Sequence, residues 1–170
     1  GIFQTNVALC TGAQFIAAPH RATEANRLPA ATAYLQPLER LAIFDADPIP
    51  RLVFDMPAAA ASTLAVHRGS GSERKNWPEN KWAELLGHLT EARGRELLMV
   101  GGEAEGERLQ RLTAALPPTF CQLARGLPLP ELGRRLAGCR AFVGHDSGIS
   151  HLAAAVGLPC LLLWGETVED

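Results

Sequence analysis

Residues 143–159 read VGHDSGISHLAAAVGLP. The apolar run 141–143 leads into a short polar turn, and small and apolar residues follow until Gly157. We interpret this pattern as a buried strand, a tight turn and a short helix that Gly157 ends. The first turn of a helix leaves backbone N–H groups without intrahelical partners, so this turn is a potential anion site.

The turn itself contains Asp146, Ser147 and Gly148. Gly148 has no side chain, which lets a ligand approach the backbone, and the helix dipole adds partial positive charge there. Phosphate is the anion that such an arrangement favours. Asp146 or Ser147 would equally serve as an ordinary helix N-cap, worth about 1 kcal/mol without any ligand. The turn alone leaves both interpretations open.

Short apolar runs alternate with amphipathic segments through most of the chain after residue 62. Five of these runs predict strands, at 64–67, 96–100, 120–123, 141–143 and 160–164. None of them alternates polar with apolar residues, so we expect parallel strands that helices bury on both faces. The predicted fold class is α/β, a Rossmann-like parallel sheet whose ligands bind at the carboxyl ends of the strands.

The first part of the chain, residues 1–61, lacks this rhythm and is rich in proline. Leucine spacing predicts one helix at 30–41, which Pro37 must start or kink. A strand is predicted at 52–54. We therefore divide the chain into a segment with its linker, 1–61, and a Rossmann-like domain, 62–170.

The bulk composition restricts the class of partner. The chain has 170 residues and a net charge of −2 at pH 7, so nothing favours nucleic acid or an anionic membrane, and phosphate recognition must be local. No apolar run approaches the roughly 20 residues of a membrane span. Four cysteines are scattered without a CxxC pair, which predicts reduced, mostly buried thiols in a cytosolic protein.

Two further polar loops follow predicted strands. The loop 67–78 combines glycines, serines and three cations including Lys75, which are the ingredients of a phosphate cradle although neither a P-loop nor GxGxxG is present. In the loop 101–106, Glu103 or Glu105 would accept hydrogen bonds from a ribose, or simply favour the helix dipole. The alternative interpretation of the loop 67–78 is a solvated loop without a ligand. Three loops that offer a cation, a ribose acceptor and a helix start favour a nucleotide diphosphate.

Two catalytic alternatives around residues 144–148 are weaker. The sequence GHDSG resembles a nucleophile elbow, but Ser147 stands one place late. As its base, His151 would project from the same helix, and His145 is the other candidate. A metal site built from His145, Asp146 and His151 lacks a separate third ligand source. We therefore expect neither a catalytic triad nor a metal ion here. We expect His151 either to face the phosphate or to pack on the core.

Three groups of residues, taken in order, resemble glycosyltransferase family 9, the heptosyltransferases of the lipopolysaccharide inner core. They are Lys75-Asn76-Trp77-Pro78 with Trp82 and Leu85, the turn Gly101-Gly102-x-x-Glu105, and Asp146-Ser147-Gly148-x-x-His151 continuing to Trp164-Gly165-x-Thr167. The match spans about residues 64–167. The resemblance implies the C-terminal, nucleotide-sugar-binding half of a GT-B fold. Arg68 is a departure, since the family usually has proline after the histidine.

The resemblance implies transfer of a sugar, with inversion, from a nucleoside-diphosphate sugar, typically ADP-heptose, to a lipopolysaccharide-core or related glycan acceptor. No cofactor is implied. The implied donor-binding residues are Ser70, Ser72 and Lys75 for the diphosphate, Glu105 for the ribose, and Asp146, Ser147, Gly148 and His151 for the phosphates and adjoining sugar.

The resemblance also implies that the general base, an aspartate near the start of the N-terminal domain, is absent. Residues 1–61 resemble only the tail of that domain, so we assign no catalytic residue and expect weak donor binding without transfer. A nucleotide-sugar-binding module and a GT-B nucleotide-sugar epimerase are the alternatives. We expect a cytoplasmic protein. Whether it contacts the inner face of the inner membrane through its acceptor stays open, and so does its oligomeric state.

Overall fold

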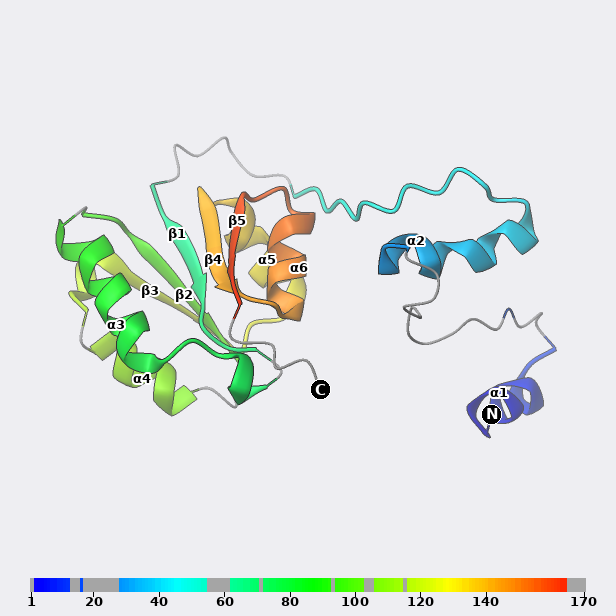
Figure 1. The fold of residues 1–170 in the computed structure, drawn as a ribbon, viewed down its shortest axis with the longest axis horizontal. Helices are drawn as coiled ribbons and strands as arrows, with labels where there is room; N and C mark the ends of the chain where they lie inside the picture. The colour runs from blue at the N-terminus through cyan, green and yellow to red at the C-terminus, as the bar shows by residue number, and fades with distance from the viewer. Residues whose placement is uncertain are drawn as a thin grey trace. The chain divides into compact units, whose positions relative to one another are not determined.

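The computed structural model describes residues 2–12, 16, 28–54, 62–70, 72–92, 94–102, 106–114 and 116–164. The chain divides into two compact units, Gly1–Pro50 and Arg51–Asp170, and Figure 1 draws the elements of each. Residues 51–54 thus belong to the second unit, whereas the boundary between residues 61 and 62 stays a prediction.

The first unit consists of short helices with little burial. They are α1 (Ile2–Cys10), α2 (Ala30–Leu35) and the 3-10 helix η2 (Gln36–Leu41). The helix predicted before residue 42 is confirmed, and its second half is 3-10 because Pro37 lacks the N–H that an α-helix needs. None of these three helices has a buried residue, so this unit contributes no apolar core among its described residues.

The second unit contains a five-stranded parallel sheet in the order β3-β2-β1-β4-β5. The strands are β1 (Leu64–His67), β2 (Leu97–Gly101), β3 (Cys121–Arg125), β4 (Ala141–His145) and β5 (Cys160–Leu163). Every neighbouring pair is parallel. The five predicted strands and their parallel arrangement are therefore confirmed, with ends shifted by up to two residues.

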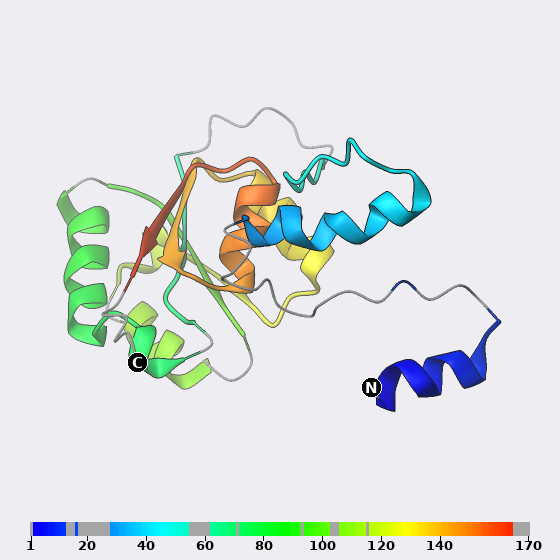
Figure 2. The ribbon, with the colours of Figure 1, turned by 45° about the vertical axis from the view of Figure 1, so that its right-hand side comes forward.

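Helices cover both faces of this sheet. They are η3 (Glu73–Lys75), α3 (Glu79–Gly87), the π-helical turn η4 (His88–Ala92), α4 (Gly106–Ala114), η6 (Pro118–Phe120), α5 (Leu129–Ala137) and α6 (Gly148–Ala155). Figures 1 and 2 show α3 and α4 on one face and α5 and α6 on the other. The described helices all fall short of the length and apolar character that crossing a bilayer requires.

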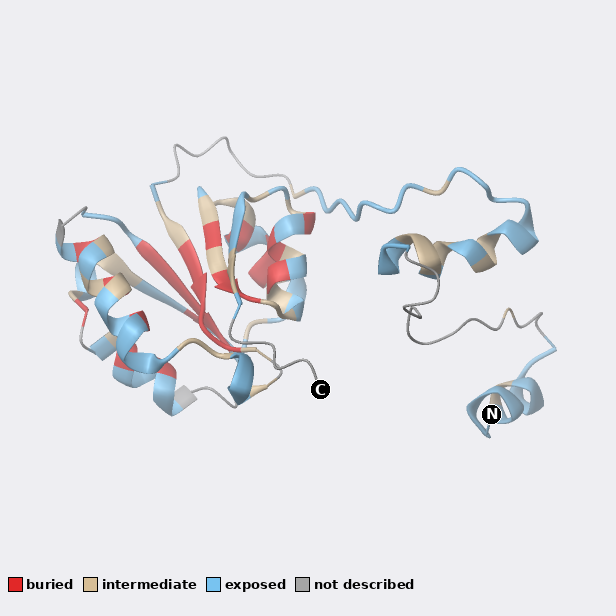
Figure 3. Cartoon of the chain, in the orientation of Figure 1, coloured by how far each residue is buried: buried red, intermediate tan, exposed pale blue. Residues whose placement is uncertain are grey.

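One apolar core lies on each face of the sheet, and the side chains of β2 point alternately into the two cores. Leu97 and Met99 belong to the α3–α4 core, while Leu98 and Val100 belong to the α5–α6 core. All four are buried, which explains why a central parallel strand reads as an uninterrupted apolar run. Figure 3 shows this burial concentrated in the central strands, with more exposed residues on the edge strand β5.

The α5–α6 face also binds a piece of chain that precedes the sheet. The Leu52 N–H donates to the Ala155 carbonyl at the end of α6, at 2.7 Å. The Phe54 ring lies against Gly133 of α5, where an added Cβ would be only 2.6 Å from Phe54 Cζ. The strand predicted at 52–54 is therefore wrong, because this segment contacts helices α5 and α6 instead of pairing with a strand, and its Val53 side chain is 89% exposed. We call residues 51–54 the strap.

The four cysteines are free thiols of unequal burial. Cys139 is buried and Cys121 half-buried, but Cys10 and Cys160 are exposed. The prediction of mostly buried thiols is therefore wrong, since Cys10 lies on a helix without buried residues and Cys160 begins an edge strand. Burial raises the pKa of the Cys139 thiol to about 11.

Candidate functional site

The carboxyl ends of β1, β2 and β4 meet at one edge of the sheet, because β1 lies between the other two strands. His67, the last residue of β1, is in register with Val100 of β2 and Gly144 of β4. The loops after these strands therefore leave the sheet side by side, as the sequence predicts. We call this edge with its loops the carboxyl edge.

The loop after β1 is held closed by its own hydrogen bonds. Ser70 Oγ donates to the Ser72 carbonyl at 2.8 Å, and the Ser72 N–H donates back to Ser70 Oγ at 3.3 Å. Lys75 follows in η3, where its backbone N–H donates to the Ser72 carbonyl at 3.1 Å. The Lys75 side chain is exposed and takes part in none of the ion pairs of the described residues. Its ammonium group is therefore available to an anion.

His145 fastens this loop to the sheet. The Trp77 N–H donates to His145 Nε2 at 3.0 Å, and His145 Nδ1 lies 2.8 Å from the Leu163 carbonyl of β5. Because Nε2 accepts, the ring proton must be on Nδ1, which donates to Leu163. His145 is 1% exposed and packs edge-on against Trp82, with 5.6 Å between ring centroids. Both ring nitrogens are therefore occupied, which excludes His145 as a base or metal ligand in this arrangement.

Ser147 caps the start of α6. Its Oγ accepts the Ser150 N–H at 3.4 Å, which is the N-cap geometry that the sequence allowed. The same oxygen lies 3.0 Å from Ser150 Oγ and 3.3 Å from His67 Nδ1, and Ser150 Oγ donates to the His145 carbonyl. These bonds connect the start of α6 to both β1 and β4.

The backbone at the start of α6 is open to a ligand. The N–H groups of Gly148 and Ile149 precede the first hydrogen-bonded residue of the helix, Ser150, where a helix leaves backbone donors without acceptors. A Cβ added to Gly148 would meet no atom within 4 Å. Space above this backbone is what an anion at a helix N-terminus requires.

Gly144 has a different reason to be glycine. A Cβ there would be 2.7 Å from the His67 carbonyl oxygen and 2.8 Å from a Phe142 ring carbon. Strands β1 and β4 therefore need a residue without a side chain at this register. Sequence reasoning missed Gly144, His67 and Ser150 as site-forming residues; a glycine and a histidine at the ends of apolar strands were the only signals.

Asp146 and His151 lie at the surface of the same helix start. His151 Nε2 is 3.9 Å from Asp146 Oδ1, and the side chains are 81% and 39% exposed. A pair this exposed adds little stability. The alternative in which His151 packs on the core is therefore wrong, whereas its role toward a phosphate stays a prediction.

Glu105 lies outside the described residues, so its ribose role also stays a prediction. The helix that follows it, α4, is tied to the loop after β1 and the start of α3. Arg108 pairs with Glu73 of η3, and Arg111 lies 3.8 Å from Glu79 of α3. The loop from β2 to α4 thus leads to a helix held beside the Ser70–Lys75 loop.

The catalytic alternatives find no support in this geometry. Ser147 Oγ bonds to His67 rather than to His145 or His151, and it accepts a backbone N–H, which is the work of a cap. No three His, Cys, Asp or Glu side chains among the described residues are grouped so that they could hold a metal ion.

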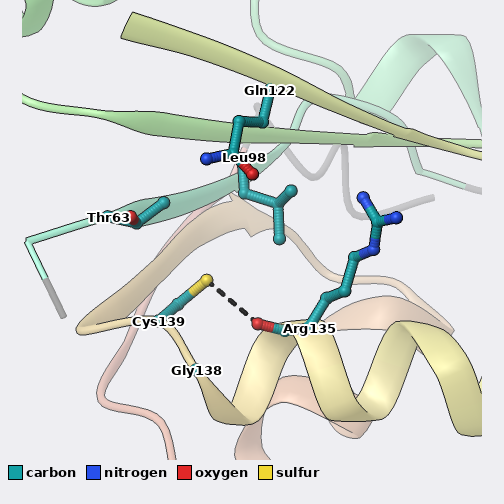
Figure 4. Close-up of a pocket in the computed structure, with 6 residues that line it drawn as sticks. All are labelled: Thr63, Leu98, Gln122, Arg135, Gly138 and Cys139. Atoms are coloured by element: carbon teal, nitrogen blue, oxygen red, sulfur yellow. Dashed lines mark hydrogen bonds between the residues drawn. The ribbon is translucent and has the colours of Figure 1, made fainter. Parts of the chain in front are cut away.

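An open hollow of about 290 Å³ lies elsewhere in the second unit (Figure 4). Its lining residues are Thr63, Leu98, Gln122, Arg135, Gly138 and Cys139. Thr63 precedes β1 and Gln122 is the second residue of β3, so the hollow is nearer the amino ends of the strands. It therefore does not belong to the carboxyl edge.

The family model described as glycosyltransferase family 9 (heptosyltransferase) matches residues 38–170. The chain belongs to this family. Lipopolysaccharide heptosyltransferase 1 of Pseudomonas aeruginosa is 40% identical over 131 residues, which are 76% of this chain and 33% of that protein. The protein of the same name from Escherichia coli is 31% identical over 113 residues, 66% of this chain and 35% of that one.

A solved structure, that of the E. coli heptosyltransferase WaaC with ADP, superimposes with a TM-score of 0.56 and 30% identity. The superposition covers 62% of this chain and 32% of that one. The family and the fold class, the C-terminal half of a GT-B fold, are thus as the sequence predicts. The chain spans about a third of the length of the curated relatives that it matches.

Proposed function

We propose that this chain is the donor-binding part of a glycosyltransferase that transfers a heptose, with inversion, from ADP-heptose to a lipopolysaccharide-core or related glycan acceptor. One observation carries the proposal: the open helix start at Gly148 and the Ser70–Lys75 loop lie at the same sheet edge, with the His67–Ser147 hydrogen bond between their strands. The family membership supports the choice of chemistry.

The electrostatics of this edge suit a diphosphate leaving group. In an inverting transfer, the acceptor hydroxyl oxygen attacks the anomeric carbon and gives its proton to a general base, while the bond to the diphosphate oxygen breaks and the nucleoside diphosphate leaves with the electron pair. The leaving diphosphate gains negative charge, which backbone N–H donors at a helix start and a cation stabilise. We assign the N–H groups at Gly148 and the Lys75 ammonium to this task, and no described residue to the general base.

The remaining donor contacts follow the family pattern. Ser70 and Ser72 are assigned to the diphosphate, Glu105 to the ribose, and Asp146, Ser147 and His151 to the phosphates and the adjoining sugar. The glycolipid acceptor, and with it a cytoplasmic location at the inner face of the inner membrane, is supported by the names of the relatives, which are lipopolysaccharide heptosyltransferases.

Calorimetric titration of the chain with ADP, UDP and GDP tests the proposal. ADP should bind most tightly, and Lys75→Ala should weaken it by about 1.5 to 3 kcal/mol, the worth of a hydrogen bond to a charged group. Lys81→Ala is the matched control, since Lys81 is an exposed lysine of α3 paired with Glu84 at 3.2 Å. The proposal fails if no nucleotide binds, or if both lysine variants bind ADP as the unsubstituted chain does.

A further inference from the structure

Arg68 is a buried cation that has no partner among the residues that the structure describes. It follows β1 directly and is only 6% exposed. Its Nε atom is fully buried and makes no hydrogen bond, and none of the ion pairs of the described residues involves it. Burying a charge without an opposite charge or hydrogen bonds costs folding free energy.

Arg68 is an exception among its neighbours. The buried polar or charged side chains of the described residues are His67, Arg68, Thr90, His145 and Ser150. Each of the other four has a side-chain hydrogen bond, including Thr90 Oγ, which donates to the Leu86 carbonyl at 3.0 Å. Asn76 Oδ1 and Trp82 Nε1 are also unpaired, but they are uncharged, so leaving them unpaired costs less than leaving a buried charge unpaired. The Arg68 guanidinium differs because it carries a charge, which an anion compensates best.

The place of Arg68 in the chain indicates which anion. The residue before it, His67, contacts the N-cap of α6, and Ser70, which hydrogen-bonds to Ser72, stands two residues after it. Arg68 therefore stands at the carboxyl edge, in the same loop as Lys75. A planar guanidinium binds phosphate oxygens through paired N–H donors, which a lysine does not offer.

We propose that Arg68 binds the diphosphate of the nucleotide donor, and that the fold keeps its charge unpaired until the donor arrives. This rests on the proposed function. Arg68 would then add to the donor affinity of this protein, beyond Lys75 and the helix start.

The proposal predicts two effects of opposite sign for Arg68→Met, which keeps the aliphatic packing and removes the charge. The melting temperature of the free chain should rise, because the unpaired buried charge is gone. The affinity for ADP should fall roughly tenfold or more, since a hydrogen-bonded charge pair is lost. The affinity for adenosine, which has no phosphate, should not change.

Arg74→Met is the matched control. Arg74 lies in η3 of the same loop and is exposed, so the substitution removes the same net charge. It should change the ADP affinity by less than about twofold at physiological salt, where exposed charges are screened.

The outcomes separate this inference from the proposed function. A melting temperature that falls, or a variant that does not fold, makes Arg68 a structural residue and overturns the inference. A melting temperature that rises with unchanged ADP affinity overturns it too, because the anion is then not the donor. If Lys75→Ala weakens ADP binding and Arg68→Met does not, only the inference fails, whereas an unsubstituted chain that binds no nucleotide overturns both.

Discussion

The two faces of the sheet are filled in different ways. The α3–α4 core uses large side chains, among them Trp82, Leu86 and Met99, and His145 connects this core to the carboxyl edge. The α5–α6 core contains alanines of three elements and buried Gly133, and the strap lies over it. One face is completed by its own helices, and the other by a segment from outside the sheet.

The two faces therefore give different roles to two residues that are not apolar side chains, His145 on one face and Gly133 on the other. On the α3–α4 side, the His145 side chain takes the place of an apolar one because its hydrogen bonds position the loop after β1. On the α5–α6 side, a missing side chain makes room for an aromatic ring from the strap. The following substitutions test whether the two faces differ in this way.

The largest effect is expected for His145→Ala on the α3–α4 side. The substitution leaves the Trp77 N–H and the Leu163 carbonyl without partners and opens a cavity beside Trp82. We expect a loss of about 3 to 5 kcal/mol in the free energy of unfolding, measured by urea denaturation. His151→Ala, at an 81% exposed side chain, should cost less than about 0.5 kcal/mol. Equal losses would show that the His145 bonds contribute nothing.

The next effect compares one glycine from each face. Gly133→Ala places a Cβ 2.6 Å from Phe54 and should destabilise the fold by about 1 to 3 kcal/mol through overpacking. Gly87→Ala in α3, where a Cβ would meet nothing within 4 Å, should instead stabilise by up to about 1 kcal/mol, because alanine favours a helix.

A double-mutant cycle assigns the Gly133 effect to the strap. In a Phe54→Ala background, Gly133→Ala should change sign and stabilise, since the clash is gone and the helix propensity remains. Thermal unfolding of the four variants measures the coupling. Additive effects of the two substitutions would mean that the strap does not lie against α5 in solution.

The smallest effect is a pH dependence from Cys139 on the α5–α6 side. Burial raises the pKa of this thiol from 9.0 to about 11, so between these values the unfolded chain loses a proton that the fold retains. Stability should therefore fall as the pH rises through this window, by at most about 1.4 kcal/mol per pH unit. Cys139→Ala should flatten this slope and Cys10→Ala, on an exposed helix, should not. The same slope in both variants would contradict the assignment.

The local sequence pattern was enough to predict the sheet, because strands buried on both faces are uninterrupted apolar runs. Residues 64–66 and 97–100 are apolar in succession, and the structure places their side chains alternately in the two cores. The pattern failed where tertiary partners decide. Strand β4 runs on through Gly144 and His145, which are not apolar, and the reason lies in Trp77 and Leu163, distant in sequence.

The candidate site was predictable in its location but not in its hydrogen bonds. Parallel strands bring their following loops to one edge, so the positions of Lys75 and Gly148 follow from topology. The link between His67 and Ser147, 80 residues apart, is a property of the β1–β4 register, which no single-sequence pattern reports. For the same reason, the burial of Arg68 was visible only in the structure.

The strap has a practical meaning for protein engineering. A shortened chain that begins at residue 62 would keep every strand, but it would leave the Ala155 carbonyl without its donor and the surface over Gly133 open to water. Chimaeras that join this domain to part of a relative should therefore be joined ahead of Arg51, so that the domain keeps its Phe54.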